Sequence, residues 1–339
     1  MGKYKVVLVG ASGAVGQEIL KVLDERNFPI GELVLCATSR SAGKEMFFRD
    51  KSYRVEETTP DSFDGTDITF FAGGAASKEF GPAAVERGAV VIDNSSNFRM
   101  DPTVPLVVPE VNPEDVKWHK GIIANPNCST IIAVVALKPI YDAAGIKRVV
   151  VSTYQAVSGA GLEALEELTT QSRAVLEQKP VTPEVFPYQI AFNLIPHIDV
   201  FMDLDYTKEE WKMVQENHKI LHDDSIAITA TTVRVPVYRS HSESINIETE
   251  KKITAAEARQ VLAKAPGIVV IDDPANKKYP MPLFASNQDE VFVGRIREDN
   301  SIPNGLNIWV AADQIRKGAA TNAVQIAELV IENSCLMKK

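Results

Sequence analysis

The chain has 339 residues, of which 45% are hydrophobic and 24% are charged, which predicts about two globular domains and excludes a disordered or collagen-like chain. Lys and Arg total 36 against 45 Asp and Glu, so the formal net charge is −9. A surface of this sign repels nucleic acid and anionic lipid, and no apolar run approaches the roughly 18–20 residues of a membrane helix, so neither partner is expected.

The N-terminus leads almost directly into a strand-like run and lacks the pattern of a secretory signal. The cysteines Cys36, Cys128 and Cys335 are an odd, sparse set without CxxC spacing, which argues against a disulfide framework. We therefore expect a cytoplasmic protein.

The first third of the chain alternates strand and helix patterns. In chain order, the expected elements are a strand at 5–9, a helix at 14–23, strands at 33–37 and 68–71, a loop of small residues at 72–76, a helix near 78–87, and strands at 89–92 and 121–124. Apolar strands alternating with helices predict a parallel sheet that is covered on both faces, so the expected fold class is α/β with a Rossmann-like domain.

A long apolar helix is expected at about 129–141, and beyond it the pattern changes. The expected elements are strands at 149–156, 226–237 and 242–250, helices at 162–176, 209–221 and 314–331, and a proline-containing extended loop at 178–205. Long strands with fewer intervening helices predict a second, α+β domain around a mixed, largely antiparallel sheet.

Residues 10–16, Gly-Ala-Ser-Gly-Ala-Val-Gly, join the first strand to the first helix. A dinucleotide pyrophosphate binds at such a turn, on backbone N–H groups at the positive end of the helix dipole. The spacing is G-x-x-G-x-x-G rather than G-x-G-x-x-G, and a tight turn without a ligand is the alternative. Its place after the first strand favours a cofactor site.

The end of the second expected strand discriminates between NAD and NADP. NAD-binding proteins usually have a carboxylate there, whereas NADP-binding proteins have an arginine. The sequence runs Thr38, Ser39, Arg40, Ser41 without an acid. This pattern favours NADP, and a solvated loop arginine is the alternative.

Cys128 lies at the start of the long apolar helix, directly after Asn127. A helix N-terminus lowers the pKa of a thiol, and the same N–H groups, together with the Asn127 amide, could hold an oxyanion. A buried structural cysteine is the alternative, and Cys36 and Cys335 fit it better. His241, at the break between two expected strands and preceded by Arg234, is the candidate proton partner.

None of the other four histidines is as strong a candidate. His119 is expected at the surface, and His197 is left open in the proline-containing loop. His218 and His222 are four residues apart on one helix face without a third ligand, so no metal site is expected.

Two further sets of charged residues are considered as possible ligand contacts from their positions in the sequence. Arg99 ends a polar segment that follows a strand, where open α/β sheets bind ligands, and it could hold a phosphate. Glu209 and Lys212 share one helix face, and taken alone they are interpreted as a solvent-exposed ion pair.

Seen together, these motifs resemble the aspartate-β-semialdehyde dehydrogenase family. The matching landmarks occur in order at residues 10–16, 39–43, 93–99, 125–128, 154–161, 234–236, 241–244 and 309–320. The resemblance implies reduction of L-aspartyl-4-phosphate to L-aspartate 4-semialdehyde by NADPH, with release of phosphate, on the route to diaminopimelate, lysine, threonine and methionine. It also implies a homodimer, an NADP-binding domain at 1–127 to which the C-terminal helix at about 318–339 returns, and a catalytic and dimerisation domain at 128–317.

The resemblance also implies a role for each candidate residue. Cys128 would form a thioester, His241 would be the general acid and base, and Gln155 would orient the acyl group, beside the Asn127 amide already named as a candidate for binding the oxyanion. Arg234 would bind the substrate α-carboxylate, Glu209 the α-amino group, and Arg99 and Lys212 the phosphate. The residues implied for NADP are Gly10, Ser12, Gly13, Ala14, Val15, Gly16, Arg40, Ser41, Ser158, Gly159 and Gln314. Whether Glu209 or the adjacent Glu210 faces the site stays open.

Four other interpretations of the sequence are the alternatives. N-acetyl-γ-glutamyl-phosphate reductase would share the cysteine, histidine and cofactor, but its acetylated substrate has no ammonium for Glu209. Glyceraldehyde-3-phosphate dehydrogenase usually uses NAD, against which Arg40 argues. A non-catalytic NADP-binding redox sensor would bind NADPH without turnover. A Cys–His hydrolase leaves the glycine loop and Arg40 unexplained.

Overall fold

The computed structural model describes residues 4–337 and divides the chain into two compact units. One unit is Met1–Asn127 with Ala319–Lys339, and the other is Cys128–Gly318. The first predicted domain also included residues 1–3 and 338–339, which lie outside the described residues.

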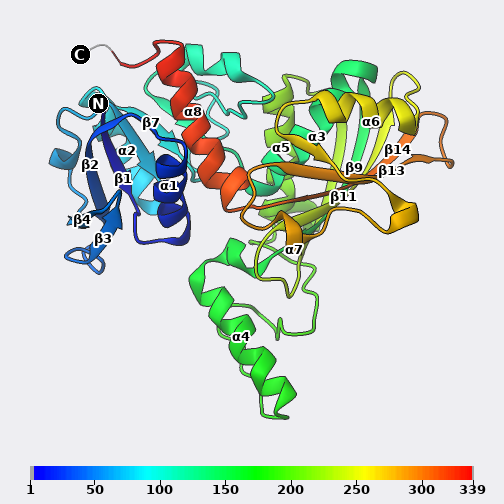
Figure 1. Ribbon diagram of the computed structural model, residues 1–339, viewed down its shortest axis with the longest axis horizontal. Helices are drawn as coiled ribbons and strands as arrows, with labels where there is room; N and C mark the ends of the chain where they lie inside the picture. The colour runs from blue at the N-terminus through cyan, green and yellow to red at the C-terminus, as the bar shows by residue number, and fades with distance from the viewer. Residues whose placement is uncertain (1–3, 338–339) are drawn as a thin grey trace. The chain divides into compact units, whose positions relative to one another are not determined.

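The first unit contains a six-stranded parallel sheet in the order β5-β2-β1-β6-β7-β8 (Figure 1). Its strands are β1 (Tyr4–Val9), β2 (Ile30–Ala37), β5 (Glu56–Glu57), β6 (Ile68–Phe71), β7 (Val90–Asp93) and β8 (Ile122–Ala124). All residues of β6 and β7 are buried, as expected for strands that are covered on both faces.

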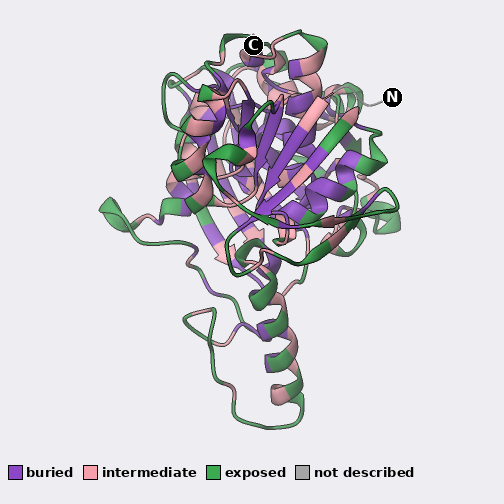
Figure 2. Cartoon of the chain, turned by 90° about the vertical axis from the view of Figure 1, so that its left-hand side faces the viewer, coloured by how far each residue is buried: buried purple, intermediate pink, exposed green. Residues whose placement is uncertain are grey.

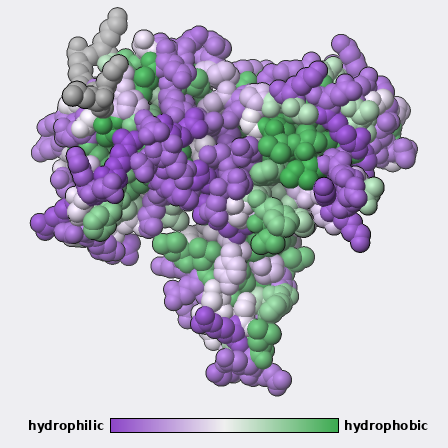
Figure 3. Space-filling model, viewed as in Figure 1, coloured by the Kyte–Doolittle hydropathy of each residue, from purple (hydrophilic) through white to green (hydrophobic). Residues whose placement is uncertain are grey.

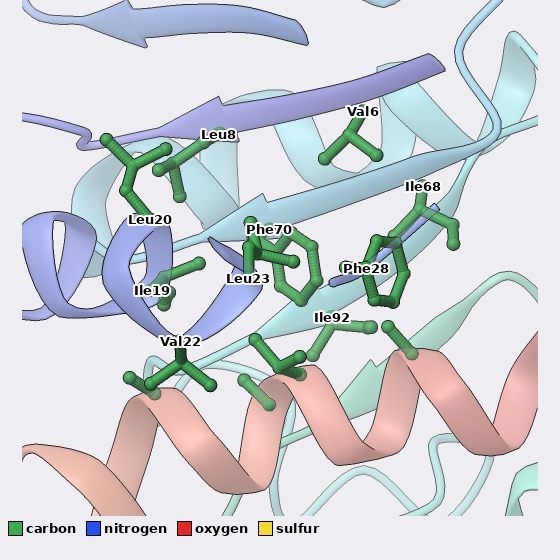
Figure 4. Packing of buried hydrophobic residues seen from close by; sticks show 14 of the residues in the cluster. Val6, Leu8, Ile19, Leu20, Val22, Leu23, Phe28, Ile68, Phe70 and Ile92 are labelled. Atoms are coloured by element: carbon green, nitrogen blue, oxygen red, sulfur yellow. The ribbon is translucent and has the colours of Figure 1, made fainter. Parts of the chain in front are cut away.

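Alternate residues of β1 pack on opposite faces of this sheet. Val6 and Leu8 join a cluster with side chains of helices α1 (Ala14–Glu25) and α8 (Thr321–Glu332), part of which is drawn in Figure 4. Val7 and Val9 instead join a cluster with residues of α2 (Gly74–Glu86). The period-2 alternation of a strand thus produces two core layers.

The second unit is built on another six-stranded sheet, in the order β10-β9-β11-β14-β13-β12. Its strands are β9 (Ile146–Gln155), β10 (Ala227–Arg234), β11 (His241–Thr249), β12 (Ile268–Val270), β13 (Val291–Asp299) and β14 (Gly305–Ala312). The pairs β9–β11, β11–β14 and β13–β14 are antiparallel, while β9–β10 and β12–β13 are parallel. The prediction of a mixed, largely antiparallel sheet is confirmed.

Helix α3 (Cys128–Ala144) contacts both α5 (Lys208–Leu221) and α6 (Ala255–Lys264), and together they pack on the sheet of the second unit (Figure 1). Helix α4 (Leu162–Leu176) extends away from that sheet, and the segment after it is mainly exposed or half-buried (Figure 2). A short helix, α7 (Pro282–Ala285), contacts β14.

Several predictions of local structure are wrong. Helix α2 begins at Gly74 rather than near residue 78, because residues 74–76 of the segment expected to form a loop are in its first turn, whereas residues 72 and 73 precede it. The hairpin of β3 (Glu45–Phe48) and β4 (Lys51–Arg54) was missed, because its strands are short and mostly exposed. The last expected helix is interrupted, since a π-helical turn, Arg316–Ala320, precedes α8.

Elements β12, β13, β14, α6 and α7 were also absent from the sequence prediction. Five short 3-10 helices complete the described chain, namely η1 (Pro60–Phe63), η2 (Pro113–Trp118), η3 (Val157–Ala160), η4 (Asp203–Asp205) and η5 (Pro274–Asn276). Over residues 4–337, none of the helices is long and apolar enough to cross a membrane.

Candidate active site

Cys128 and His241 lie side by side in the second unit. Cys128 is the first residue of α3 and is half-buried, and His241 is the first residue of β11 and is fully buried. The Cys128 Sγ and the His241 Nε2 are 3.5 Å apart. A thiol at a helix N-terminus beside an imidazole is the arrangement of an activated cysteine nucleophile.

The backbone of Ala156 fixes the tautomer of His241. The Ala156 N–H donates a hydrogen bond of 3.0 Å to His241 Nδ1. Nδ1 is therefore an acceptor, and in the neutral ring the proton is assigned to Nε2, which faces the sulfur. Burial, reinforced by the Arg234 charge, holds the pKa of His241 well below its ordinary value. The resting histidine is consequently neutral and directs an N–H group at Cys128.

Arg234 ends β10, is buried, and contacts the backbone of the same residue, Ala156. Its Nη1 donates 2.7 Å to the Ala156 carbonyl. Burial lowers the pKa of Arg234 despite the opposing effects of Glu209 and Cys128. A Cβ on Gly159 would lie 3.0 Å from Arg234 Nη1 and 3.4 Å from the His241 ring, so these two side chains would have to shift slightly to admit any other residue.

A hydrogen-bonded chain of side chains extends from the end of β9 to α5. Thr153 donates 2.9 Å to Gln155 Oε1, and Gln155 Nε2 donates 3.2 Å to Glu209 Oε1. Lys212 Nζ lies 3.0 Å from Glu209 Oε2 and 2.8 Å from Asp199 Oδ2. Burial alone would lower the pKa of Lys212, but the two carboxylates reverse this effect and raise it.

The interpretation of Glu209 and Lys212 as an exposed ion pair is therefore wrong. Glu209 is only 5% exposed because α5 packs over the end of β10 and turns this face inward. Glu210 has a different role, since its carboxylate accepts hydrogen bonds from the N–H groups of Thr207 (2.7 Å) and Thr232 (3.0 Å). Glu210 thus caps α5, and Glu209 is the residue that contacts Gln155.

Three of the residues predicted for the cofactor lie in the same unit. Gln314 Nε2 donates to Ser158 Oγ, and Gln314 Oε1 accepts a hydrogen bond of 2.8 Å from the Ser240 N–H. Because Ser240 precedes His241 and Gly159 approaches its ring, these residues surround the histidine.

Glu243 was missed by the sequence analysis. It lies two residues after His241 on β11, is fully buried, and accepts no hydrogen bond from the described residues. Burial raises its pKa well above the ordinary value of a carboxyl group, so we infer a neutral carboxylic acid at this position.

The predicted phosphate-binding loop lies in the first unit. Gly10 has φ +85°, and a Cβ on Gly16 would lie 2.2 Å from the Gly10 carbonyl oxygen, so the turn requires glycine at both positions. The N–H groups of Gly10 and Ala11 donate to the Cys36 carbonyl (2.8 and 3.2 Å), which fixes the loop to the end of β2. Ser12, Gly13, Ala14 and Val15 complete the turn, and no side chain caps α1 at Gly13.

Arg40 is exposed in the turn that follows β2. The sequence analysis missed Lys44, whose Nζ lies 3.5 Å from Ser41 Oγ. The Ser41 hydroxyl group therefore lies close to a second cationic side chain in addition to Arg40. Ser12 and Lys44 line one cleft of about 590 Å³ beside α1.

Arg99 is buried in the first unit. Its Nε donates 2.9 Å to the Asn125 carbonyl, and its Nη2 donates 2.9 Å to the Asn94 carbonyl. Asn127 is also buried in this unit and directly precedes Cys128 in the chain.

The remaining histidines and cysteines lie elsewhere. His119 is half-buried rather than at the surface, since its Nε2 lies 2.7 Å from the Cys335 carbonyl oxygen. His218 Nε2 lies 2.7 Å from the Ile226 carbonyl oxygen, His222 is exposed, and His197 stacks on Phe201. Within residues 4–337, no His, Cys, Asp or Glu side chains form a group that could hold a metal ion. Burial raises the pKa of Cys36 to about 11, which makes it unreactive.

Comparison with known proteins identifies the family. Residues 5–119 match the family described as semialdehyde dehydrogenase, NAD binding domain, and residues 137–317 match semialdehyde dehydrogenase, dimerisation domain. The chain is 61% identical to an aspartate-semialdehyde dehydrogenase of Aquifex aeolicus, covering 98% of this chain and 99% of the relative. It is 56% identical to that of Campylobacter jejuni, covering 97% and 98%.

Solved structures give the same result. Aspartate semialdehyde dehydrogenase II of Vibrio cholerae, complexed with ASA, matches with a TM-score of 0.96 and 47% identity over 98% of this chain and 99% of the other. The enzyme of Candida albicans with NADP matches with a TM-score of 0.77 and 27% identity, covering 98% and 99%. The α/β fold class and the predicted resemblance are confirmed, and N-acetyl-γ-glutamyl-phosphate reductase is not favoured. The chain belongs to the aspartate-semialdehyde dehydrogenase family.

Proposed function

We propose that this oxidoreductase reduces L-aspartyl-4-phosphate to L-aspartate 4-semialdehyde with NADPH, and releases phosphate, through a thioester on Cys128. The observation that supports this most directly is the 3.5 Å contact between the thiol of Cys128 and the Nε2 of a buried, neutral His241. An acyl phosphate reacts poorly with hydride, and a thioester divides the reaction into two easier steps.

The first step needs a thiolate and cations for the leaving group. The N-terminus of α3 and the Nε2–H of His241 both stabilise negative charge on the sulfur. The thiolate forms the C–S bond, and the acyl C–O bond breaks with its electron pair leaving on phosphate. Lys212 and Arg99 would bind that phosphate, and Gln155 and Asn127 would orient the acyl oxygen.

The second step needs a hydrogen-bond donor for the oxygen that becomes negative. When bound, NADPH supplies the hydride that reduces the thioester carbon. Because His241 Nδ1 accepts the Ala156 N–H, the neutral ring carries its proton on Nε2, and this Nε2–H would donate a hydrogen bond to the oxyanion of the thiohemiacetal. Collapse of the oxyanion re-forms the carbonyl, breaks the C–S bond and regenerates the Cys128 thiolate, so atoms and charge balance.

The residues of the first unit fit a phosphorylated dinucleotide. The glycine loop leaves the N-terminus of α1 without a side-chain cap, which suits a pyrophosphate, and Arg40, Ser41 and Lys44 suit a 2′-phosphate. Ser158, Gly159 and Gln314 would contact the cofactor from the second unit. These features support NADP as the cofactor.

Replacing Arg40 by alanine is expected to raise the KM for NADP⁺ about 10-fold and to leave the KM for NAD⁺ and for the aldehyde unchanged. The reason is the loss of one charge-assisted contact at an exposed position, a loss of about 1.5 kcal/mol. Lys21→Ala is the matched control, because Lys21 lines the same cleft as Lys44 and already lies 3.8 Å from Glu18 and Glu25. An unchanged KM for NADP⁺ in Arg40→Ala would assign the 2′-phosphate to another residue.

Glu209 would recognise the α-ammonium group of the substrate, and Arg234 its α-carboxylate. Glu209→Gln is expected to lower kcat/KM for aspartate semialdehyde about 100-fold, since hydrogen bonds to a charged group contribute about 1.5–3 kcal/mol. Glu210→Gln is the matched control, and there we expect a loss of about 1 kcal/mol in unfolding free energy with kcat/KM retained. Equal kcat/KM values for wild type and Glu209→Gln would remove the ammonium contact from the proposal.

We also propose a homodimer formed by the second unit, acting in the cytoplasm. The matched family domain is a dimerisation domain, and α4 with the segment after it exposes large apolar side chains (Figure 3). These side chains are Leu162, Leu176, Val185, Tyr188, Phe192, Leu194, Val200, Phe201, Met202 and Leu204. An apolar surface of this kind is typical of an obligate interface.

The thioester can be tested by omitting phosphate. Aspartate semialdehyde and NADP⁺ without phosphate are expected to give a stoichiometric burst of NADPH and an aspartyl mass increase on the Cys128 peptide. Adding phosphate should convert the burst into steady turnover. A steady rate that is independent of phosphate, with no acylated peptide, would contradict the mechanism.

A further inference from the structure

A buried glycine of the π-helical turn packs against the proposed nucleophile. A Cβ built on Gly318 would lie 2.9 Å from Cys128 Cβ, 3.3 Å from Cys128 Cα and 3.4 Å from Gln314 Cβ. Carbon atoms in favourable contact are about 3.5–4.0 Å apart. A side chain at this position would therefore require either Cys128 or the turn to move.

The turn is held firmly by the Asp313 carboxylate, which is fully buried. Its Oδ1 accepts the N–H groups of Ile315 (2.9 Å) and Arg316 (3.0 Å), and its Oδ2 accepts the N–H of Asn287 (2.7 Å). The Gly318 N–H itself donates 3.2 Å to the Asp313 carbonyl, five residues earlier. π-Helical turns are rare and are frequent at functional sites.

The same turn is tied to the strand that presents the histidine. Asp313 follows the last residue of β14, Ala312, and Ala312 pairs directly with His241 across the β11–β14 ladder. The side chain of Arg316 further forms a bidentate contact with Asp289 (2.8 and 3.0 Å). The turn is fixed by the β11–β14 pairing next to Asp313 and by the contact of Arg316 with Asp289. A side chain added at Gly318 would therefore displace Cys128 rather than the turn.

We propose that Gly318 is a positioning residue for Cys128. The absence of a Cβ lets the turn lie against the Cys128 side chain and sets the distance from Sγ to His241 Nε2. This inference rests on the proposed role of Cys128 as the nucleophile. It deepens that role by naming the feature that holds the sulfur in place.

Gly318→Ala tests the proposal through the thiol as well as through turnover. We expect kcat to fall about 100-fold with the KM for NADP⁺ unchanged, because small displacements of reacting groups have effects of this size. We also expect slower alkylation of Cys128 by iodoacetamide, with the midpoint of its pH profile shifted upward, because the sulfur moves away from the Nε2–H. Peptide mass mapping separates Cys128 from Cys36 and Cys335.

Gly81→Ala is the matched control, since Gly81 lies in α2 and its added Cβ would make an ordinary 3.5 Å contact with the Phe98 ring. All readouts should match wild type there. For Gly318→Ala, a wild-type kcat and alkylation profile would overturn the proposal. So would a loss of activity that only follows the folded fraction in circular dichroism, or a chain that yields no folded protein. If wild type itself shows no turnover, the proposed function fails, and the alkylation profile still decides the role of Gly318.

Discussion

Cys128→Ala is expected to abolish turnover, with kcat reduced by at least about 10⁴-fold, while NADPH binding remains close to that of wild type. The reason is chemical, since without the sulfur no thioester forms and hydride has no reducible acyl carbon. The cofactor residues proposed in the first unit do not depend on this side chain. Isothermal titration of NADPH and the phosphate-dependent assay measure the two properties separately.

Cys335→Ala provides the matched control for this experiment. Cys335 is half-buried near the C-terminus, outside the residues that surround His241, and turnover should be unchanged when it is replaced. Retained turnover in Cys128→Ala would remove Cys128 from the mechanism. Loss of both turnover and NADPH binding would instead indicate a fold defect.

His241→Asn is expected to lower kcat by about 10²–10³-fold, the usual effect of removing one hydrogen-bond donor to a developing oxyanion. Alkylation of Cys128 should also become slower, since the thiolate loses the Nε2–H that faces it. His222→Asn is the matched control, because His222 is exposed at the C-cap of α5 in the left-handed conformation, which asparagine tolerates. Unchanged kcat in His241→Asn would contradict the proposed stabilisation of the oxyanion by His241.

The lowered pKa of His241 also makes the free energy of unfolding depend on pH, and His241→Asn should weaken this dependence. Burial and Arg234 keep the folded histidine neutral, whereas in the unfolded chain it binds a proton below about pH 6.5. The unfolded state therefore binds more protons, so the contribution of this group is full above about pH 6.5 and is lost as the pH falls. Urea unfolding between about pH 7 and pH 5 should show a smaller loss of unfolding free energy in His241→Asn than in wild type.

Much of the first unit could be predicted because its strands are short apolar runs between glycine-containing turns. The strand at 68–71 and the helix beginning at Ala14 lie where the pattern placed them. The β3–β4 hairpin has no such pattern, since its residues are mostly exposed and its turn depends on the positive φ of Arg49 and Asp50. Local hydrophobicity cannot indicate a pairing that buries little.

The candidate site likewise contains residues that could be predicted from the sequence and residues that could not. Cys128 and His241 stand out by residue type and position, and the structure brings their reacting atoms together. The burial of Glu209 could not be predicted, because it depends on how α5 packs over the end of β10. Ala156 acts through its backbone, and Gly318 through the absence of a side chain, so neither leaves a chemical signal in the sequence.

The most direct test of the central claim is the reverse reaction, followed as NADP⁺ reduction. L-Aspartate semialdehyde and N-acetyl-glutamate semialdehyde should each be supplied with and without inorganic phosphate, with NAD⁺ in place of NADP⁺ as a control. The proposed function predicts fast NADPH formation only when aspartate semialdehyde, phosphate and NADP⁺ are present together. Turnover only with the acetylated aldehyde, or none with either aldehyde despite NADPH binding, would contradict it.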